Sequence, residues 1–420
     1  MTKGRARLVI LGTGWGSFSV LRNLKKKLYD VTVVSPRNYF LFTPLLAGTT
    51  VGTLEFRSIV EPIRKSSYRQ ASENFHMARA MGWDMRNQAI QCRSILKPDI
   101  EYTLPYDKLV IGVGMLPNTY NIKGVKEHAF FLKEVSDARK IRNHLIHNFE
   151  LSVKPGIGEK EKKRLLHIVI VGGGPTGVEF GAELYDFLRE DITRLFSQRK
   201  SDVRVTLIEG KQILSMFDHQ LQQYAEQKIR ARENYDLITD TVSEVRHDGV
   251  LLSNGTFLPC GLVVWSAGLA PNEFSNSLPH SIKNKQGQIV TDDYLRVIAD
   301  ASQNTYALGD CATILTQPLP ATAQVANRQG EYLAQALNFE GSGKGAYEVP
   351  FKHQSRGMLV YIGGYRALSD LPDFKLKGFL SWFLWRSAYL SQLASWRLKL
   401  QVPMDWLKTI LFGRDTSRLE

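Results

Sequence analysis

Two glycine-rich turns are the clearest chemical feature of the sequence, because glycine at these spacings lets a backbone wrap closely around phosphate. The first, GTGWGS, covers residues 12–17, and the second, GGGPTG, covers residues 172–177. Each turn follows an apolar run and precedes a stretch that predicts a helix. In this context the free N–H groups and the positive dipole end of the helix bind the pyrophosphate of a dinucleotide. The chain is therefore predicted to hold two dinucleotides.

The second turn has the full G-x-G-x-x-G spacing, with Gly172, Gly174 and Gly177. The first glycine permits the tight turn, the second lets the backbone approach the pyrophosphate, and the third lets helix pack on strand. Glu209 closes the next apolar run, VRVTLIE, where a carboxylate binds ribose hydroxyls and repels a 2′-phosphate. This pattern favours NADH over NADPH, and a turn without a ligand is the weaker alternative.

The first turn departs from that spacing, because Ser17 stands where the third glycine belongs and Gly16 comes one place early. Serine is still small, so close packing of the helix is retained. The acid that would end the following strand is also missing. Ser35, Pro36 and Arg37 stand at this place instead. We expect Ser35 to hydrogen-bond a ribose, and Arg37 to contact phosphate or to stack on adenine.

A Gly-Asp pair in NTYALGDCA, residues 304–312, indicates which nucleotide the first turn holds. Many flavoproteins use such an aspartate, here Asp310, to hold the ribitol and pyrophosphate of FAD. A helix cap is the alternative for an isolated aspartate, but two glycine turns precede this one. NADH and FAD together imply hydride transfer from nicotinamide to flavin.

The elements around these motifs predict an α/β protein with two Rossmann-like dinucleotide-binding domains. Strands are expected at 7–11, 30–35, 166–171 and 203–209, and within 106–118, 261–272 and 304–312. Helices are expected at roughly 16–28 and at 321–337, and a charged loop at 152–164. At 420 residues the chain exceeds one ordinary core. The expected domains are a FAD-binding domain in two parts (1–135 and 286–345), an NADH-binding domain (136–285) and a C-terminal segment (346–420).

Charge and cysteine content narrow the possible partners. The net charge of +13 suggests an anionic partner such as phospholipid or a phosphorylated cofactor, while no motif supports nucleic-acid binding. Cys92, Cys260 and Cys311 are isolated in sequence, so no dithiol centre is encoded locally. The electrons must therefore pass to a diffusible acceptor. No metal site is expected, and no targeting segment precedes the first apolar strand.

The C-terminal stretch 378–400, GFLSWFLWRSAYLSQLASWRLKL, is strongly aromatic. On one helix, Ser381, Gln392, Ser395 and Lys399 would share a polar face, while Arg386 and Arg397 interrupt the apolar side. This pattern favours a helix lying in a membrane interface, with tryptophans at headgroup depth, rather than a span. A second, shorter helix is expected at 402–412. A dimer interface is the alternative for both.

With these residues assembled, the chain resembles the type II NADH dehydrogenases, or alternative NADH:quinone oxidoreductases, and in particular their mitochondrial branch. The similarity runs nearly end to end. Its segments are GTGWGS, VSPRNYFLFTPLL (34–46), IVGGGPTGVE (170–179), WSAG (265–268), LGD (308–310), TAQVA (322–326) and the FLWRSAYLS tail.

The resemblance implies glutathione-reductase-type domains, FAD at the first turn, NADH at the second, and NADH oxidation coupled to two-electron ubiquinone reduction without proton pumping. It also implies a homodimer, peripheral membrane attachment through residues 378–412, and a place on the mitochondrial inner membrane, with a bacterial cytoplasmic membrane as the alternative. The expected FAD contacts are Gly12, Gly14, Trp15, Gly16, Ser35, Pro36, Arg37, Gly114 and Asp310. The expected NADH contacts are Gly172, Gly174, Pro175, Thr176, Gly177, Glu209 and Gly268.

Three residues are implied at the reacting centre. Glu179 matches the family's acid near flavin and nicotinamide, although an acid in the first turn of a helix is also favoured by the dipole alone. Gln324 matches the residue lining the quinone site. Arg328 stands where the family commonly has glutamine, and it would favour an anionic quinone species or a different acceptor.

Two rival functions remain open at this level. A sulfide:quinone oxidoreductase needs paired reactive cysteines near the flavin. A flavoprotein related to apoptosis-inducing factor would bind NADH with slow turnover, and the aromatic tail speaks against it.

Overall fold

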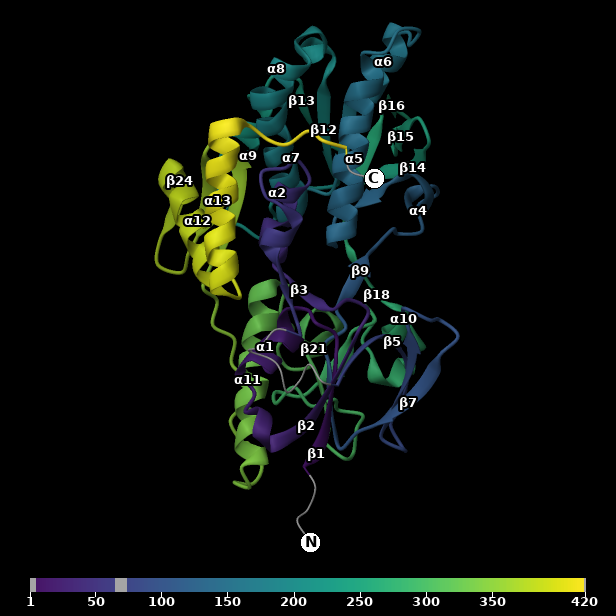
Figure 1. The fold of residues 1–420 in the computed structure, drawn as a ribbon, viewed down its shortest axis with the longest axis vertical. Helices are drawn as coiled ribbons and strands as arrows, with labels where there is room; N and C mark the ends of the chain where they lie inside the picture. Colours follow the sequence, from purple (N-terminus) through teal and green to yellow (C-terminus); the bar gives the residue numbers. More distant parts are fainter. Residues whose placement is uncertain (1–4, 65–73, 419–420) are drawn as a thin grey trace. The chain divides into compact units, whose positions relative to one another are not determined.

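The computed structural model describes residues 5–64 and 74–418, which form two compact units. The first unit comprises Met1–Leu41, Val60–Leu116 and Leu269–Ser355. The second comprises Phe42–Ile59, Pro117–Gly268 and Arg356–Glu420. Each unit contains a largely parallel sheet with helices against it, so the predicted α/β class is confirmed (Figure 1).

The first unit is built on a seven-stranded sheet in the order β20-β8-β1-β2-β5-β6-β7. The strands from β20 to β5 run parallel, and β5, β6 and β7 form an antiparallel meander. Apolar runs such as LVIL at 8–11 are buried, as expected for parallel strands covered on both faces. The bounds are β1 Ala6–Leu11, β2 Tyr29–Ser35, β5 Phe75–Asp84, β6 Ala89–Ser94, β7 Glu101–Pro105, β8 Lys108–Ile111 and β20 Thr305–Ala307.

Two long helices of this unit, α1 and α11, lie side by side (Figure 1). Their close approach depends on Gly330, because a Cβ there would lie 2.4 Å from the carbonyl oxygen of Gly16. The helices are α1 Trp15–Asn23, α10 Glu273–Ser277 and α11 Ala323–Gly341. The shorter strands are β3 Tyr39–Leu41, β4 Val60–Pro62, β9 Met115–Pro117, β18 Leu269–Pro271, β19 Ile289–Thr291 and β21 Ala312–Ile314.

The second unit has a five-stranded parallel sheet in the order β10-β17-β11-β12-β13. Its strands are β10 Phe130–Phe131, β11 His167–Val171, β12 Arg204–Glu209, β13 Tyr235–Thr239 and β17 Leu262–Trp265. A small antiparallel sheet follows, with β14 Val242–Arg246, β15 Gly249–Leu252 and β16 Phe257–Pro259. The helices are α2 Leu46–Thr49, α4 Val125–His128, α5 Val135–Ser152, α6 Glu159–Leu165, α7 Pro175–Phe187, α8 Thr193–Leu195 and α9 His219–Arg230.

The C-terminal part of the chain belongs to the second unit. It begins with a three-stranded antiparallel sheet, β22 Met358–Gly363, β23 Arg366–Asp370 and β24 Lys375–Gly378. Two helices follow, α12 Phe379–Gln392 and α13 Trp396–Phe412. β22 packs on α7 and α12 packs on β23, so this part is integrated with the nucleotide-binding fold.

Two local predictions were wrong. The helix expected over 16–28 ends at Asn23, and a separate 3-10 helix covers Lys26–Leu28. The loop expected over 152–164 contains α6, Glu159–Leu165. Its acids lie in the first turn and its cations in the last, and Glu159–Lys162 and Glu161–Arg164 pair at 2.8 and 2.6 Å. These charges favour a helix through its dipole and through i,i+3 contacts.

The single helix expected over 378–400 was also wrong, because the chain is extended at Leu393 and Ser395. The second helix then begins at Trp396 rather than near 402. Ser381 is fully buried and hydrogen-bonded to Ser369, so the predicted polar face does not exist. Trp385 and Trp406 are buried as well, and neither can lie at headgroup depth. The sheet β22–β24 covers the side of α12 that the sequence alone left uncovered.

Packing divides the chain at different places from the predicted domains. Residues 42–59 pack with the second unit, although they were assigned to the first part of the FAD-binding domain. After that segment, the chain passes from one unit to the other at 116–117 and at 268–269, rather than at 135 and 285.

Candidate active site

The first glycine turn leaves the start of α1 open. Gly12 has φ +92°, and a Cβ there would lie 2.3 Å from the carbonyl oxygen of Gly112. Gly14 is the N-cap of α1 and makes no side-chain cap, and a Cβ on it would meet nothing within 4 Å. No acid stands in the first turn of the helix. Backbone N–H groups at such a helix end suit a phosphate.

Buried hydroxyls hold the first turn together. Ser17, in the place of the third glycine, donates a hydrogen bond to the carbonyl of Leu11 at 3.0 Å. The Ser35 hydroxyl is 3.0 Å from that of Thr13, so its side chain is engaged within the turn. The Arg37 guanidinium lies over the Tyr39 ring, 5.7 Å from its centroid. Trp15 packs edge-on against Phe40, and Pro36 lies between Ser35 and Arg37.

The Gly-Asp turn is pinned by a residue that the sequence analysis did not assign. Gly309 has φ +73°, and its N–H donates to the Gln329 side-chain oxygen at 2.8 Å. Gln288 donates to the Asp310 carbonyl at 3.1 Å. Gln329 is next to Arg328 in sequence, but nothing in the sequence pairs it with residue 309.

These groups collect at one end of the first unit's sheet. Gly12 follows β1, Ser35 ends β2, Gly114 follows β8 and Asp310 follows β20. Gly114 has φ +66°, and a Cβ on it would meet nothing within 4 Å. Ligands of open parallel sheets bind outside the carboxyl ends of the strands. The arrangement fits FAD, with its pyrophosphate at the start of α1.

The second turn is tighter. Gly172 has φ +108°, and a Cβ on Gly177 would lie 2.0 Å from the Gly172 carbonyl oxygen. Gly174 caps α7 without a side-chain hydrogen bond and borders open space, and Pro175 and Thr176 begin the helix. The helix N-terminus is therefore open to a phosphate here too.

Glu209 closes the second turn from the next strand. One carboxylate oxygen accepts the Gly173 N–H at 2.7 Å and the other accepts the Lys211 N–H at 3.1 Å. Gly268, after β17, has φ +67°, and a Cβ there would lie 2.2 Å from the Tyr120 hydroxyl. The residues expected to contact NADH thus meet at the carboxyl ends of β11, β12 and β17.

The residues implied at the reacting centre lie in different units. Gln324 is in the first turn of α11 of the first unit, where Thr322 caps Val325. Arg328, one turn on, is half-buried and reaches Glu331 at 3.4 Å. Glu179 is on α7 of the second unit.

A small cavity lies inside the second unit. Residues 42–59, α7, β22, α12 and α13 all contribute to its wall. Its polar and aromatic lining includes Glu179, Glu183, Tyr361, Trp385 and Trp406, with Gly48 on the opposite segment.

Glu179 is the carboxyl that this cavity perturbs most clearly. It is buried, and its Oε1 accepts the Tyr361 N–H at 3.2 Å. Burial raises the pKa of Glu179 to about 8, with the nearby Glu183 adding to the rise. At neutral pH the carboxyl is therefore mostly protonated. Its predicted place in the first turn was wrong, since α7 begins at Pro175 and Glu179 lies in the second turn.

Two cavity residues were missed by sequence reasoning. Glu183 follows Glu179 by four residues, a spacing that places both on one helix face. Trp385 is 4% exposed, and its indole N–H has no hydrogen-bond partner among the described residues. It lies near enough to lower the Glu179 pKa. A buried donor of this kind suits a ligand oxygen.

The cysteines argue against a dithiol mechanism. Cys92, Cys260 and Cys311 are all buried and free. Burial raises the pKa of Cys92 and Cys260 to about 12 and that of Cys311 to about 11. Reactive thiols have a lowered pKa and partial exposure, so the geometry does not support the sulfide:quinone alternative.

Comparison with known proteins agrees with this geometry. Residues 6–330 match the family of pyridine nucleotide-disulphide oxidoreductases, and residues 355–415 match the NDH2 C-terminal domain. An internal alternative NAD(P)H-ubiquinone oxidoreductase A1 of Solanum tuberosum, described as mitochondrial, is 44% identical over 99% of this chain and 88% of its own length. The chain belongs to the type II NADH dehydrogenases.

Two further relatives support the assignment. A probable NADH dehydrogenase of Dictyostelium discoideum is 43% identical over 98% of this chain and 91% of its own length. The solved structure of NDH2 from Plasmodium falciparum in complex with NADH is 28% identical, with a TM-score of 0.92, and the match covers 99% of this chain and all of that one. The predicted family and fold are confirmed, and the individual contact residues stay predictions.

Proposed function

We propose that this chain catalyses NADH oxidation and two-electron ubiquinone reduction, without proton pumping, at a membrane surface. The observation that carries this is the pair of open glycine turns in separate units, together with a cavity lined by the buried carboxyl of Glu179, whose pKa burial raises. The alternative NAD(P)H-ubiquinone oxidoreductases that are 33–44% identical to it act on NAD(P)H and ubiquinone by name, and this supports the proposal.

The first half-reaction, hydride transfer from NADH to FAD, depends on the residues around the two glycine turns. Bound FAD supplies the two-electron carrier between NADH and quinone. The residues at the carboxyl ends of β11, β12 and β17 hold NADH, and Glu209 disfavours a 2′-phosphate by charge. Those at β1, β2, β8 and β20 would hold FAD, with Asp310 as the residue expected to bind its ribitol.

The second half-reaction needs a proton beside the electrons. A quinone takes two electrons and two protons to become the quinol, and a hydride brings both electrons with one proton. The remaining proton comes from Glu179, which is protonated at neutral pH because burial raises its pKa to about 8. The Trp385 N–H offers a hydrogen bond to a quinone oxygen. A quinone contact by Gln324 and Arg328 stays a prediction of the family resemblance.

The C-terminal helices support attachment to a membrane surface. A stripe of apolar residues on α13 is more than half exposed, including Trp396 at 80%, Leu400 at 64% and Met404 at 66%. Phe379, Leu380 and Phe383 extend it on α12. Such exposure is unusual without a partner, and an interfacial helix buries such a face in lipid. Within the described part of the chain, no helix is long and apolar enough to cross a membrane.

The relatives support a mitochondrial location. Several of them are described as mitochondrial. A peripheral place on the mitochondrial inner membrane is compatible with the proposed reduction of ubiquinone at a membrane surface. A homodimer remains a prediction.

The decisive test is anaerobic NADH consumption by the FAD-loaded protein with and without a short-chain ubiquinone. Quinone-dependent turnover, faster with NADH than with NADPH, is expected. Flavin reduction without quinone turnover would contradict the quinone half. For the membrane half, Leu400→Asp should weaken co-flotation with anionic vesicles without changing flavin reduction. Leu96→Asp, at an exposed leucine of the first unit, is the matched control.

A further inference from the structure

The helix that carries Glu179 continues into an unusually acidic and buried stretch. Glu183, Asp186 and Asp191 are each at most 8% exposed, and Glu190 is partly exposed beside them. A π-helical turn at Leu188–Ile192 follows α7 and carries the last two acids. π-Bulges of this kind are frequent at functional sites. So many buried carboxyls require cations or protons to balance them.

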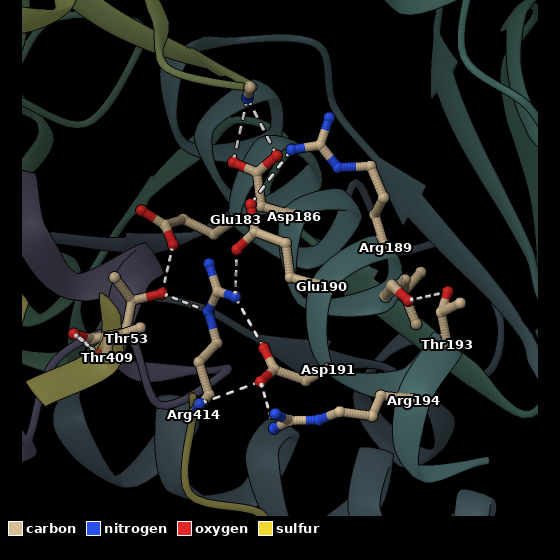
Figure 2. A network of polar contacts seen from close by, with 12 residues as sticks. Thr53, Glu183, Asp186, Arg189, Glu190, Asp191, Thr193, Arg194, Thr409 and Arg414 are labelled. Atoms are coloured by element: carbon tan, nitrogen blue, oxygen red, sulfur yellow. Dashed lines mark hydrogen bonds and ion pairs between the residues drawn. The ribbon is translucent and has the colours of Figure 1, made fainter. Parts of the chain in front are cut away.

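The main cation that balances these carboxylates comes from the C-terminal segment of the chain. Arg414, just after α13, has a side chain that is 6% exposed. Its Nη1 lies 2.9 Å from Glu190 Oε2 and 2.8 Å from Asp191 Oδ2 (Figure 2). Its backbone N–H donates to Asp191 Oδ1 at 3.1 Å. The guanidinium is therefore held in place by two ion pairs.

Two further hydrogen bonds connect Arg414 to the quinone cavity. Arg414 Nε donates to the Thr53 hydroxyl at 2.9 Å, and that hydroxyl donates to Glu183 Oε2 at 2.6 Å (Figure 2). Glu183 lines the same cavity as Glu179, one helical turn further along α7. The chain Arg414–Thr53–Glu183 thus runs from the C-terminal segment to the cavity wall.

We propose that Glu183 is a second proton-holding carboxyl of the quinone cavity, and that Arg414, acting through Thr53, is the positioning residue that controls its ionisation. This rests on the proposed quinone reduction at that cavity. When Glu179 releases its proton to form the quinol, its carboxylate takes a proton from Glu183. Solvent then returns one proton to Glu183, so the pair is restored after each turnover.

The groups around Glu183 act in opposite directions. Burial raises its pKa, and Asp186 adds to the rise, while Arg414, the Thr53 hydroxyl and Arg386 of α12 oppose it. Glu179 on the same helix and Tyr361 of β22 have their own pKa values raised in part by Glu183. A carboxyl under such opposed influences exchanges protons nearer to neutral pH than an exposed one, which suits proton transfer.

The experiment follows the pH dependence of flavin reoxidation by short-chain ubiquinone in the FAD-loaded protein. The variants are Arg414→Gln, Thr53→Val and Glu183→Gln. Arg418→Gln is the matched control, because Arg418 is an exposed arginine in the same segment. Flavin reduction by NADH is measured on each variant, and it should be unchanged.

The wild-type rate should fall as pH rises and the donor carboxyl loses its proton. Arg414→Gln removes a cation that favours the ionised form of Glu183. The falling limb of the pH–rate profile should therefore move to higher pH by about half a unit or more. Thr53→Val should move it the same way by less. Glu183→Gln removes a negative charge near Glu179, so the limb should move to lower pH and the maximal rate should drop severalfold.

Opposite shifts in the arginine and glutamate variants would not arise from loosened packing. Limbs that coincide with the control, or that all move one way, would overturn the inference. If Arg414→Gln fails to fold, Thr53→Val and Glu183→Gln decide the question, since both keep Arg414 paired with Asp191. A wild-type protein that reduces flavin but never passes electrons to ubiquinone would contradict the proposed function instead.

Discussion

The two glycine turns begin with the same construction and end with different residues. Each follows a buried parallel strand, has a positive-φ first glycine and leaves its helix start uncapped. The second turn is closed by Glu209, whose carboxylate accepts the Gly173 N–H. The first is closed by uncharged hydroxyls, those of Thr13 and Ser35. The glycines thus provide phosphate binding in both units, and the closing residue provides the charge that selects the cofactor.

The helices that follow the turns differ as well. α1 carries no acid, and its buried residues pack against α11 through Gly16 and Gly330. α7 buries Glu179, Glu183 and Asp186 along its length. Burying carboxyls costs stability unless they are paired or protonated. The buried carboxyls occur in α7, which lines the cavity, and α1 has none. We infer that α1 stabilises the fold by packing, whereas α7 supplies the proton-carrying side chains of the reaction.

The largest effect is expected for Gly12→Ala in the first turn. The left-handed φ of +92° and the 2.3 Å approach to Gly112 leave no room for a Cβ. The variant should lose FAD and about 2 kcal/mol or more of unfolding free energy. Flavin absorbance and thermal melts check both.

Gly14→Ala is the matched control, because φ there is −75° and a Cβ would meet no protein atom within 4 Å. It should weaken FAD binding while the fold stays intact. Equal loss of stability in the two variants would contradict this view of the turn.

The second prediction contrasts the two helices through pH. Glu179 has a native pKa of about 8 and an ordinary value of 4.5, so the native state keeps a proton that the unfolded state loses. Wild-type stability should therefore fall as pH rises from 5 to 8, by up to about 1.4 kcal/mol per pH unit. Glu179→Gln should make this slope shallower, while Glu183 and Asp186, whose pKa values burial also raises, keep the remainder. Denaturant titrations at pH 5.5 and 7.5 measure it.

Ser17→Ala in α1 serves as the comparison, since it changes no charge. Its stability relative to wild type should be the same at both pH values. A wild-type protein equally stable at both pH values would show that Glu179 does not hold its proton in the native state.

Local sequence patterns were sufficient for the strands, the turns and the family. The runs RLVIL and VRVTLIE are apolar enough to be buried strands, and glycine spacing locates both helix starts. The break between α12 and α13 could not be predicted, because it depends on β22–β24 covering α12. An aromatic run can be buried or exposed, and which of the two occurs depends on the elements that pack against it in the folded protein.

The same limit applies to the candidate site. Glu179 was identified through a motif, but its pKa depends on Tyr361, Trp385 and Glu183 brought around it by folding. Arg414 lies 231 positions after Glu183, and no periodic pattern links such distant residues. Gln329, which pins the Gly309 N–H, is hidden for the same reason.

A third prediction sharpens the contrast between the closing residues. Glu209→Gln keeps an oxygen acceptor for the Gly173 N–H but removes the negative charge. The preference for NADH over NADPH, measured as a ratio of kcat/KM values, should fall about tenfold, which corresponds to roughly 1.4 kcal/mol. Ser35→Ala in the first turn should leave that ratio unchanged. An unchanged ratio in Glu209→Gln would assign cofactor selection to other residues.

The smallest effect is expected for Ser17→Gly, which restores the glycine that the first turn lacks. The hydroxyl of Ser17 donates to the Leu11 carbonyl at 3.0 Å, and both groups are buried. Losing that hydrogen bond and placing glycine in a helix should cost about 1–2 kcal/mol of unfolding free energy. FAD content should stay the same, because the pyrophosphate meets the N–H groups of the turn rather than this hydroxyl.

The reverse change at the matching position, Gly177→Ser, would place a Cβ 2.0 Å from the carbonyl oxygen of Gly172. It should weaken NADH binding far more, which titration of the oxidised protein with NAD⁺ would measure. Loss of FAD in Ser17→Gly would instead make the serine a cofactor contact, and the two turns would then differ in how they hold phosphate as well as in what closes them.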